Sequence, residues 1–250
     1  MSLRSKISGI SMIAAVAAGT VGVTGGAASA SPASGSDRAS SASPAYKPPG
    51  RVLREGSRGS DVRALQQRLA ALRYYPGTAD GNFGASTLEA VWAFQEVNHL
   101  PVTGQVASRT KAALVHPHAY QPHYPRQSGT RVEVNLGMGV LVLYRNHRIA
   151  LVSHESSGGH YRYGDGAYAE TPTGKFHAER FISGWHRSEL GELYNPVYFV
   201  GGYAIHGDTS VPAAPVSHGC VRVPMDIAAW FHRDVRIGSH GTQVWIYNQW

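Results

Sequence analysis

The sequence has a single cysteine, few charged residues and, beyond its first 30 residues, no long apolar run. One cysteine in 250 residues cannot form a disulfide within the chain, which excludes a disulfide-stabilised scaffold. Charged residues make up 16% and aromatic residues 10% of the chain, which excludes a disordered polyelectrolyte. No strict repeat is sustained, so collagen-like and coiled-coil fibres are excluded as well. One or two globular domains remain possible.

Basic residues are in modest excess and are spread along the chain. The formal net charge is +7; residues 51–115 hold eight basic and five acidic residues, and residues 116–250 hold eleven and ten. Because no strip of Lys and Arg stands out, we expect no nucleic-acid partner. The excess on 51–115 would suit an acidic polymer such as a cell wall, although a solvated face explains it more simply.

The first 30 residues have the three-part pattern of a secretory signal peptide. Arg4 and Lys6 precede a mostly apolar stretch at 7–23, and the small residues Ala28-Ser29-Ala30 follow it. A membrane anchor is the alternative, but polar residues dilute the stretch and no basic residues close its far side. We therefore predict cleavage after Ala30 and a secreted protein without a stable membrane anchor.

Two Pro-rich segments divide the remaining chain. Residues 31–50 are small and polar, a composition typical of a disordered linker. In residues 116–130 three prolines each remove a helical hydrogen bond and restrict the preceding residue. This second segment is also His-rich, but its irregular spacing favours a plain linker over a metal site. Two folded units are therefore predicted, at 51–115 and at 131–250.

The first unit has the pattern of a small three-helix domain. Ser60 and Asp61 would cap a helix that ends near Tyr75, and residues 86–89 (STLE) have the capping-box pattern of a second helix. A short third helix is predicted at 108–115. The apolar positions of the first two helices recur three and four residues apart: Val62, Leu65, Leu69, Leu72, Leu88, Val91, Trp92, Phe94 and Val97.

The order of these elements resembles the type 1 family of peptidoglycan-binding domains. The matching residues run through nearly the whole unit: Gly56, Gly59, Val62, Leu65, Gln66, Leu69, Leu72, Asp80, Gly81, Asn82, Phe83, Gly84, Thr87, Ala90, Val91, Phe94, Gln95, Leu100, Thr103, Gly104, Thr110 and Leu114. The resemblance implies a module that anchors the protein to peptidoglycan. Most of the matching residues are core, cap or turn positions, so a domain that keeps the fold without binding is the alternative.

The second unit has the pattern of a β-rich domain. Residues 131–135 alternate apolar and polar side chains, and apolar runs at 140–144 and 149–152 flank a polar turn, which predicts a β-hairpin. Further β-prone runs are 198–200, 203–205 and 244–247. A helix is expected only at 225–232.

The single cysteine, Cys220, is a candidate nucleophile. It lies in the sequence SHGCVR at 217–222, with His206 upstream. A lone thiol in an exported protein is exposed to oxidation, so its presence is most simply explained by a need for it. A nearby imidazole and loop amides would favour the thiolate, which is the reactive form. A buried structural cysteine and a zinc site with His206 and His218 are the alternatives, although the usual zinc frameworks are missing.

These motifs resemble the YkuD-type catalytic domain of L,D-transpeptidases. The matching segments are 152–158 (VSHESSG), 171–176 (TPTGKF), 202–207 (GYAIHG) and 217–222 (SHGCVR). The resemblance spans 131–248 and implies a β-sandwich-like catalytic domain. One departure is Ser-Ser-Gly at 156–158 in place of the more common Ser-Thr-Gly.

The family's catalytic roles carry over to matching residues. The resemblance implies that Cys220 attacks the substrate, that His206 is the base and that the Gly207 backbone carbonyl orients the imidazole. His218 would shape the pocket and tune the thiolate. The backbone N–H groups of Gly219 and Cys220 would form the oxyanion hole.

The substrate-binding residues follow from the same motifs. Arg222 would bind a substrate carboxylate, because its planar guanidinium suits a bidentate contact. Ser217 and Tyr203 complete the predicted set. The segment 181–198 lies where the family has a substrate-covering insertion. Its aromatic residues would line the site or pack on the β-core: Trp185, His186, Tyr194 and Tyr198.

The implied reaction is acyl transfer on peptidoglycan in the cell wall. The thiolate would attack the carbonyl of the third stem residue, a diamino acid, release the terminal D-Ala and leave a thioester. An amine of a neighbouring stem would then form a 3→3 cross-link. Water as acceptor would make an L,D-carboxypeptidase, and a lipoprotein lysine would make an attachment enzyme. An inactive wall-binding protein and a zinc peptidoglycan peptidase are the competing interpretations. We expect a monomer without metal or other cofactor.

Overall fold

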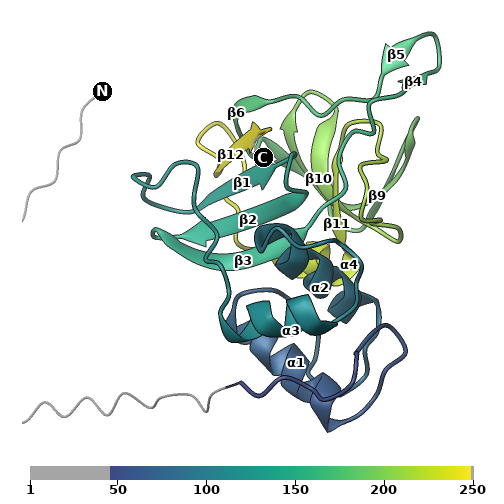
Figure 1. Cartoon of the computed structure of the whole chain (residues 1–250). Coiled ribbons are helices and arrows are strands. Elements are labelled where there is room, and N and C mark those ends of the chain that lie inside the picture. Colours follow the sequence, from purple (N-terminus) through teal and green to yellow (C-terminus); the bar gives the residue numbers. More distant parts are fainter. Residues whose placement is uncertain (1–45, 249–250) are drawn as a thin grey trace, which may run out of the picture. The chain divides into compact units, whose positions relative to one another are not determined.

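Residues 46–248 of the protein are described by a computed structural model (Figure 1). The predicted signal peptide and residues 31–45 of the predicted linker lie outside the described residues. The helices α1 (Ser60–Ala71), α2 (Ala85–Val97) and α3 (Ser108–Val115) precede the strands. Within the described range, no helix is long and apolar enough to cross a membrane.

Both predicted side-chain caps of the helical region are wrong. The N-cap of α1 is Gly59, and no side chain caps this helix. The carboxylate of Asp61 instead pairs with Arg51 at 2.8 Å. The helix α2 begins before the predicted capping box and has Gly84 as its N-cap, also without a side-chain cap. Thr87 therefore lies inside the first turn and is buried, where its hydroxyl accepts a hydrogen bond from Gln66 at 3.1 Å.

The strands form two five-stranded sheets, which confirms the predicted β-rich domain. The first sheet has the order β3-β2-β1-β12-β6, and the second has the order β11-β10-β9-β7 with β8 paired to β9. The strands of the first sheet are β1 (Arg131–Asn135), β2 (Val140–Arg145), β3 (Arg148–His154), β6 (Gly174–His177) and β12 (Gln243–Tyr247). Those of the second are β7 (Arg180–Phe181), β8 (Trp185–Ser188), β9 (Gly191–Val200), β10 (Tyr203–Asp208) and β11 (Val221–Pro224). A small hairpin of β4 (Arg162–Tyr163) and β5 (Ala167–Tyr168) and the helix α4 (Met225–Phe231) complete the region.

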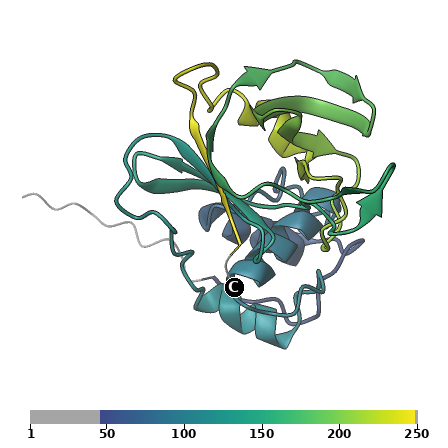
Figure 2. The same cartoon turned by 90° about the horizontal axis from the view of Figure 1, so that it is seen from above.

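Strand β2 is buried on both of its faces. Leu141 and Leu143 belong to a core that also contains residues of the second sheet, whereas Val140 and Val142 belong to a core that contains residues of α1 and α2. Successive side chains of a strand point to opposite faces, so the helices and the second sheet cover opposite sides of β2. Figure 2 shows this layering. The continuous apolar run at 140–144 reflects burial on both faces, as is typical of such strands.

The segment 116–130, predicted as a plain linker, packs against the β-rich region. Tyr120 is buried, and its hydroxyl lies 2.7 Å from the hydroxyl of Tyr247 on β12. The His123 ring stacks on the Tyr247 ring at 4.2 Å. Together with the shared core on β2, these contacts join the helical and β-rich regions into one compact unit.

The same segment explains why strand β1 is buried along its whole length. Residues 131–135 alternate apolar and polar side chains, yet the polar residues Arg131 and Glu133 are buried and form an ion pair at 2.7 Å. The N–H of His123 donates to Glu133 at 3.0 Å, and Arg131 donates to the Gln127 carbonyl at 3.0 Å. Burial of the pair depends on these additional hydrogen bonds, because removing two charges from water is costly.

A buried carboxyl group lies directly after β3. Glu155 is 3% exposed. The pKa of Glu155 is raised to about 8, mainly by burial. The charge of His154 lowers this pKa, and the charge of Glu96 raises it. In an unfolded chain a glutamate has a pKa of about 4.3. The folded protein therefore keeps Glu155 mostly protonated at neutral pH, whereas the unfolded chain does not.

We expect Glu155→Gln to stabilise the protein at about pH 8 and to have little effect near pH 4. The pKa of Glu155 is higher in the folded protein than in the unfolded chain. As pH rises from the unfolded pKa to the folded pKa, the unfolded chain ionises this group and the folded protein does not, so the wild type loses stability over this range. Glutamine resembles the protonated carboxyl group and does not titrate. The difference should reach a few kcal/mol, since one pKa unit corresponds to about 1.4 kcal/mol.

Urea unfolding of both proteins across this pH range measures the effect. Glu179→Gln is a matched control, because Glu179 is exposed. Parallel pH profiles for the wild type and Glu155→Gln would contradict the assignment of the titration to Glu155.

Candidate active site

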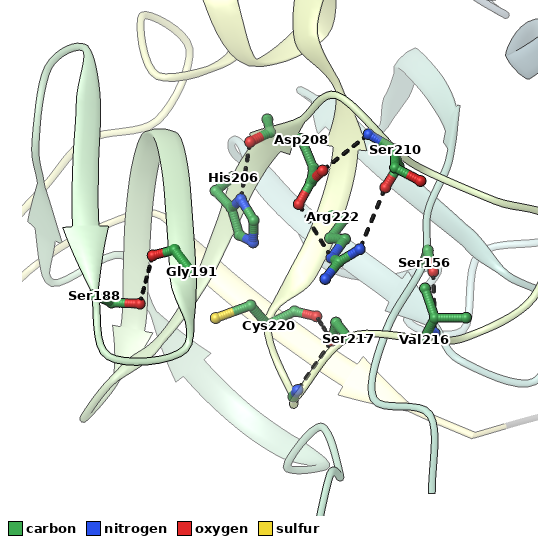
Figure 3. A network of polar contacts seen from close by, with 12 residues as sticks. Ser156, Ser188, Gly191, His206, Asp208, Ser210, Val216, Ser217, Cys220 and Arg222 are labelled. Atoms are coloured by element: carbon green, nitrogen blue, oxygen red, sulfur yellow. Dashed lines mark hydrogen bonds and ion pairs between the residues drawn. The ribbon is translucent and has the colours of Figure 1, made fainter. Parts of the chain in front are cut away.

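The predicted site residues lie together on two neighbouring parallel strands. His206 is on β10, and Cys220 directly precedes β11. His206 and Arg222 are register partners across these strands. Figure 3 shows His206, Cys220 and Arg222 around one space, with Asp208 and Ser217 beside them. The strand pairing thus brings together residues from two motifs that are separate in sequence.

His206 is held as a neutral imidazole with one defined tautomer. The side chain is buried, and its Nδ1 lies 2.9 Å from the Gly207 carbonyl oxygen. A carbonyl only accepts, so Nδ1 carries the proton and Nε2 remains free to accept one. Burial lowers the pKa of His206, against the opposing effect of this hydrogen bond. The imidazole is turned towards Cys220 (Figure 3), so the geometry is that of a base beside a thiol.

The Cys220 thiol is kept protonated, contrary to the prediction that its surroundings favour the thiolate. Burial raises its pKa, and the smaller effects of the Ala204 backbone and Arg222 act in the opposite direction. The sulfur also lies 3.9 Å from the Gly202 carbonyl oxygen, an acceptor that suits the neutral thiol. The resting pair is therefore a thiol and a neutral imidazole, and the proton moves when the sulfur attacks.

We expect alkylation of Cys220 by iodoacetamide to accelerate with pH through a pKa above the usual thiol value of about 8.5. The reason is that the thiolate is the species that reacts and burial disfavours it. Mass spectrometry of the alkylated protein measures the rate, and the same protein unfolded in urea is the control. A folded-state pKa at or below that of the unfolded protein would contradict a neutral resting thiol.

The loop before Cys220 is organised by the Ser217 hydroxyl. This hydroxyl donates to the Cys220 carbonyl at 2.5 Å and accepts from the Gly219 N–H at 2.9 Å. The Gly219 N–H is thus already bonded within the loop, which contradicts its assignment to an oxyanion hole. Ser217 lines the cavity, but its hydroxyl shapes the loop.

Gly219 occupies a position that no larger residue fits. Its φ of +136° lies in a region that L side chains rarely adopt, and a Cβ there would lie 2.5 Å from the Tyr203 ring and 2.7 Å from the Glu170 carbonyl oxygen. The Tyr203 ring therefore closes over the backbone next to Cys220. This contact makes Tyr203 part of the site's wall.

Thr171 is a site residue whose role the sequence did not indicate. Its hydroxyl donates to the Gly219 carbonyl at 2.8 Å and accepts from the Gly158 N–H at 2.9 Å. The three motif segments around 158, 171 and 219 therefore meet at one hydroxyl group. The signal was present in the threonine of the TPTG motif, but only the fold shows what it contacts.

Arg222 is paired with an acid that sequence reasoning missed. Its Nε lies 3.2 Å from Asp208 Oδ2, and its Nη1 lies 3.4 Å from the Ser210 carbonyl oxygen. Figure 3 shows both contacts. Asp208 lies two residues after His206 on β10, so the alternation of a strand places the two side chains on one face. Through Asp208 and Ser210, Arg222 therefore holds the end of β10 beside β11, and it also lines the cavity.

A cavity of about 440 Å³ opens above Cys220 and His206. One wall is the turn between β8 and β9, which contributes Ser188, Glu189, Leu190, Gly191 and Glu192. Among the four aromatic residues predicted for this segment, Tyr198 lines the cavity. Trp185 is 51% exposed and packs on Tyr194 at 5.3 Å.

His218 also lines the cavity. Its ring meets the edges of Tyr161 and Tyr163 at centroid distances of 5.7 and 4.7 Å. Tyr163 lies on the small β4–β5 hairpin and also lines the cavity. In the part of the chain that the structure describes, no group of three His, Cys, Asp or Glu side chains is arranged to hold a metal ion.

Two family models match the chain, in the order predicted. Residues 58–114 match a peptidoglycan binding domain, and residues 129–246 match the L,D-transpeptidase catalytic domain, YkuD. The crystal structure of an L,D-transpeptidase from Xylanimonas cellulosilytica is 38% identical, has a TM-score of 0.74 and matches 80% of this chain and 100% of that chain.

Curated relatives match over a shorter region. A spore cortex-lytic enzyme of Bacillus cereus is 37% identical over 86 residues, which are 34% of this chain and 33% of that protein. An N-acetylmuramoyl-L-alanine amidase of Bacillus licheniformis is 37% identical over 81 residues, 32% of this chain and 22% of that protein. The chain thus spans about a third or less of the length of these relatives.

Proposed function

Because the chain belongs to the L,D-transpeptidase family, with a YkuD-type catalytic domain and an N-terminal peptidoglycan-binding domain, we propose that it forms 3→3 cross-links in peptidoglycan through a cysteine thioester. The observation that carries the proposal is the placement of the single cysteine beside a buried imidazole whose Nδ1 is held by a backbone carbonyl. This pair lies in an open cavity of about 440 Å³, which is large enough for a peptide segment.

The first half of the reaction transfers an acyl group to the enzyme. His206 Nε2 takes the Cys220 proton as the sulfur attacks the carbonyl carbon of the third stem residue. When the tetrahedral intermediate collapses, the C–N bond to the terminal D-Ala breaks, and the leaving amine takes the proton from His206. A thioester remains on Cys220.

The second half transfers the acyl group to an amine. The side-chain amine of a second stem attacks the thioester carbonyl, and His206 accepts the proton that this amine loses. The C–S bond breaks, the sulfur regains a proton, and the new amide is the cross-link. Both halves use the same base, so the neutral imidazole must be restored between them.

The remaining site residues have proposed roles in binding and charge stabilisation. The Cys220 N–H is the proposed oxyanion donor, since the Gly219 N–H is engaged. His218 and Tyr203 form walls against the stem peptide. Arg222 contacts a substrate carboxylate with the guanidinium N–H groups that its ion pair with Asp208 leaves available.

The helical region is the proposed wall-binding part of the molecule. It holds eight basic and five acidic residues between 51 and 115, which suits an acidic polymer. With the signal-peptide pattern at 1–30, this supports a secreted, wall-associated protein. We propose that it acts as a monomer.

Incubation of the mature protein with defined tetrapeptide muropeptides, followed by mass spectrometry, tests the proposal. Cross-linked dimers that have lost one D-Ala are the expected products. Tripeptide monomers alone would instead identify an L,D-carboxypeptidase, and attachment to a lysine-containing peptide would identify an attachment enzyme. No product, together with no covalent carbapenem adduct on Cys220, would indicate an inactive wall-binding protein.

A further inference from the structure

One buried histidine connects the helical region to the loop that leads to the cysteine. His154, the last residue of β3, has its Nδ1 2.8 Å from Glu96 Oε1 on α2 and its Nε2 3.0 Å from the Pro212 carbonyl oxygen. Pro212 lies between β10, which carries His206, and Cys220. His154 is 1% exposed and Glu96 is 8% exposed, so both contacts are made away from solvent.

The protons on this histidine follow from its partners. The Pro212 carbonyl can only accept, so Nε2 carries a proton. Burial lowers the pKa of His154, but the hydrogen bond and the charge of Glu96 together with the Pro212 carbonyl outweigh it, so the pKa is raised and the imidazolium, with both ring nitrogens as donors, is favoured. A hydrogen bond from a charged donor in a buried site is stronger than a neutral one. The imidazole therefore binds α2 and the Pro212 carbonyl at the same time.

The ring itself is fixed by packing. The Trp92 ring of α2 meets the His154 ring edge-on at a centroid distance of 5.3 Å. A Cβ on Gly139 would lie 3.1 Å from the same oxygen, Glu96 Oε1, so the turn between β1 and β2 packs closely against the carboxyl group. The imidazole has little freedom to turn away from Pro212.

The residues after His154 hold the same loop at three further points. Ser156 and Arg222 exchange backbone hydrogen bonds at 3.1 and 3.0 Å. The Ser156 hydroxyl donates to the Ala214 carbonyl at 2.8 Å, and the Ser217 N–H donates to the Ser157 carbonyl at 2.8 Å. Segment 154–157 therefore contacts segment 212–222 at several points along its length, and the His154 contact to Pro212 is the first of them in sequence.

We propose that His154 is a positioning residue that holds the 209–217 segment in place for Cys220, and that Glu96 of the helical region fixes the orientation of its ring. The inference rests on the proposed cysteine mechanism. It gives the helical region a second task, as a structural part of the catalytic unit. Neither residue touches the cavity that contains Cys220 and His206.

Two substitutions of His154 separate its two contacts. The amide nitrogen of asparagine occupies the place of Nδ1, and that of glutamine occupies the place of Nε2. His154→Asn thus keeps the contact to Glu96 and loses the one to Pro212, whereas His154→Gln does the reverse. A misplacement of about 1 Å near reacting groups can lower a rate by about 100-fold, so we expect kcat losses up to that size in His154→Asn and a much smaller loss in His154→Gln.

A second pair of variants tests Glu96 against its neighbour on the same helix. Gln95 is also buried, but its amide bonds to Gly104 and Gln105 within the helical region. Both Glu96→Ala and Gln95→Ala should lower the melting temperature. Only Glu96→Ala should lower kcat at a temperature at which melts show the variants to be folded.

The measurement is kcat and KM on a tetrapeptide muropeptide, with the wild type in parallel. Wild-type turnover tests the proposed mechanism separately, so its absence would overturn that mechanism as well as this inference. With an active wild type, equal kcat losses in the two His154 variants, or wild-type kcat in Glu96→Ala, would overturn the positioning role alone. If His154→Asn does not fold, the comparison of Glu96→Ala with Gln95→Ala decides the question.

Discussion

Replacing Cys220 with alanine is expected to abolish acyl transfer, with a loss on the order of 10⁶-fold, as removal of a nucleophile produces in other acyl-transfer enzymes. The chain has no other cysteine that could substitute for it. The hydrogen bond from the thiol to the Gly202 carbonyl is long at 3.9 Å, so little stability should be lost. Product analysis with tetrapeptide muropeptides measures activity, and thermal melts measure stability.

Cys220→Ser is the matched control for this result. It keeps the size and polarity of the side chain but replaces the thiol with a poorer nucleophile of much higher pKa. We expect it to fold like the wild type, to give no carbapenem adduct and to be nearly as inactive as the alanine variant. Wild-type turnover in Cys220→Ala would rule out a thioester intermediate.

Replacing His206 with alanine is expected to lower kcat by about 10²- to 10⁴-fold, the range typical of a positioned general base. Apparent substrate binding should change little, because Nε2 acts on the thiol proton. Since burial raises the pKa of Cys220, the thiol cannot supply enough thiolate by itself at neutral pH. The loss should therefore appear in the acylation step, which carbapenem adduct formation at Cys220 reports.

The pH dependence of the wild type checks the same assignment. Burial lowers the pKa of His206, so the neutral base persists to lower pH, and the acidic limb of kcat/KM should lie below the usual histidine value of about 6.5. His240→Ala is a suitable control, because His240 is exposed. Loss of acylation in His240→Ala, or wild-type acylation in His206→Ala, would contradict the role of His206 as base.

Residues whose chemistry is local could be predicted from the sequence. A lone cysteine in a chain with a signal-peptide pattern and a histidine in the GYAIHG motif identified Cys220 and His206, and the structure brings them to adjacent strands. The β2–β3 hairpin was also predictable, since two β-prone runs flank a polar turn. In each of these cases the motif or pattern that supports the prediction spans only a short stretch of the sequence.

Features that depend on distant partners could not be predicted. Arg131 and Glu133 alternate with valines as on a solvated strand, but a segment from before β1 covers them. The Gly219 N–H looked free because its acceptor, the Ser217 hydroxyl, is a loop contact without a sequence signature. Asp208 was overlooked because its partner Arg222 belongs to another motif.

The apolar run at 140–144 also indicates how strand β2 is covered. The run at 140–144 lacks the alternation of a strand with one solvated face, and a strand of this kind is usually covered on both sides. That pattern already indicated that something packs on the outer face of the first sheet. The helices were the elements available to do so, which would have excluded an open linker between the two regions.

The core shared by β2 and the helices also limits how this protein can be recombined. A truncated protein that starts at residue 129 would expose Val140, Val142, Tyr144 and Val152 on one face of the first sheet. An exposed apolar patch of this kind favours self-association. A helical region grafted from another family member would have to pack its apolar side chains on this same face. Substitutions on one side of the shared core are therefore constrained by the residues on the other side.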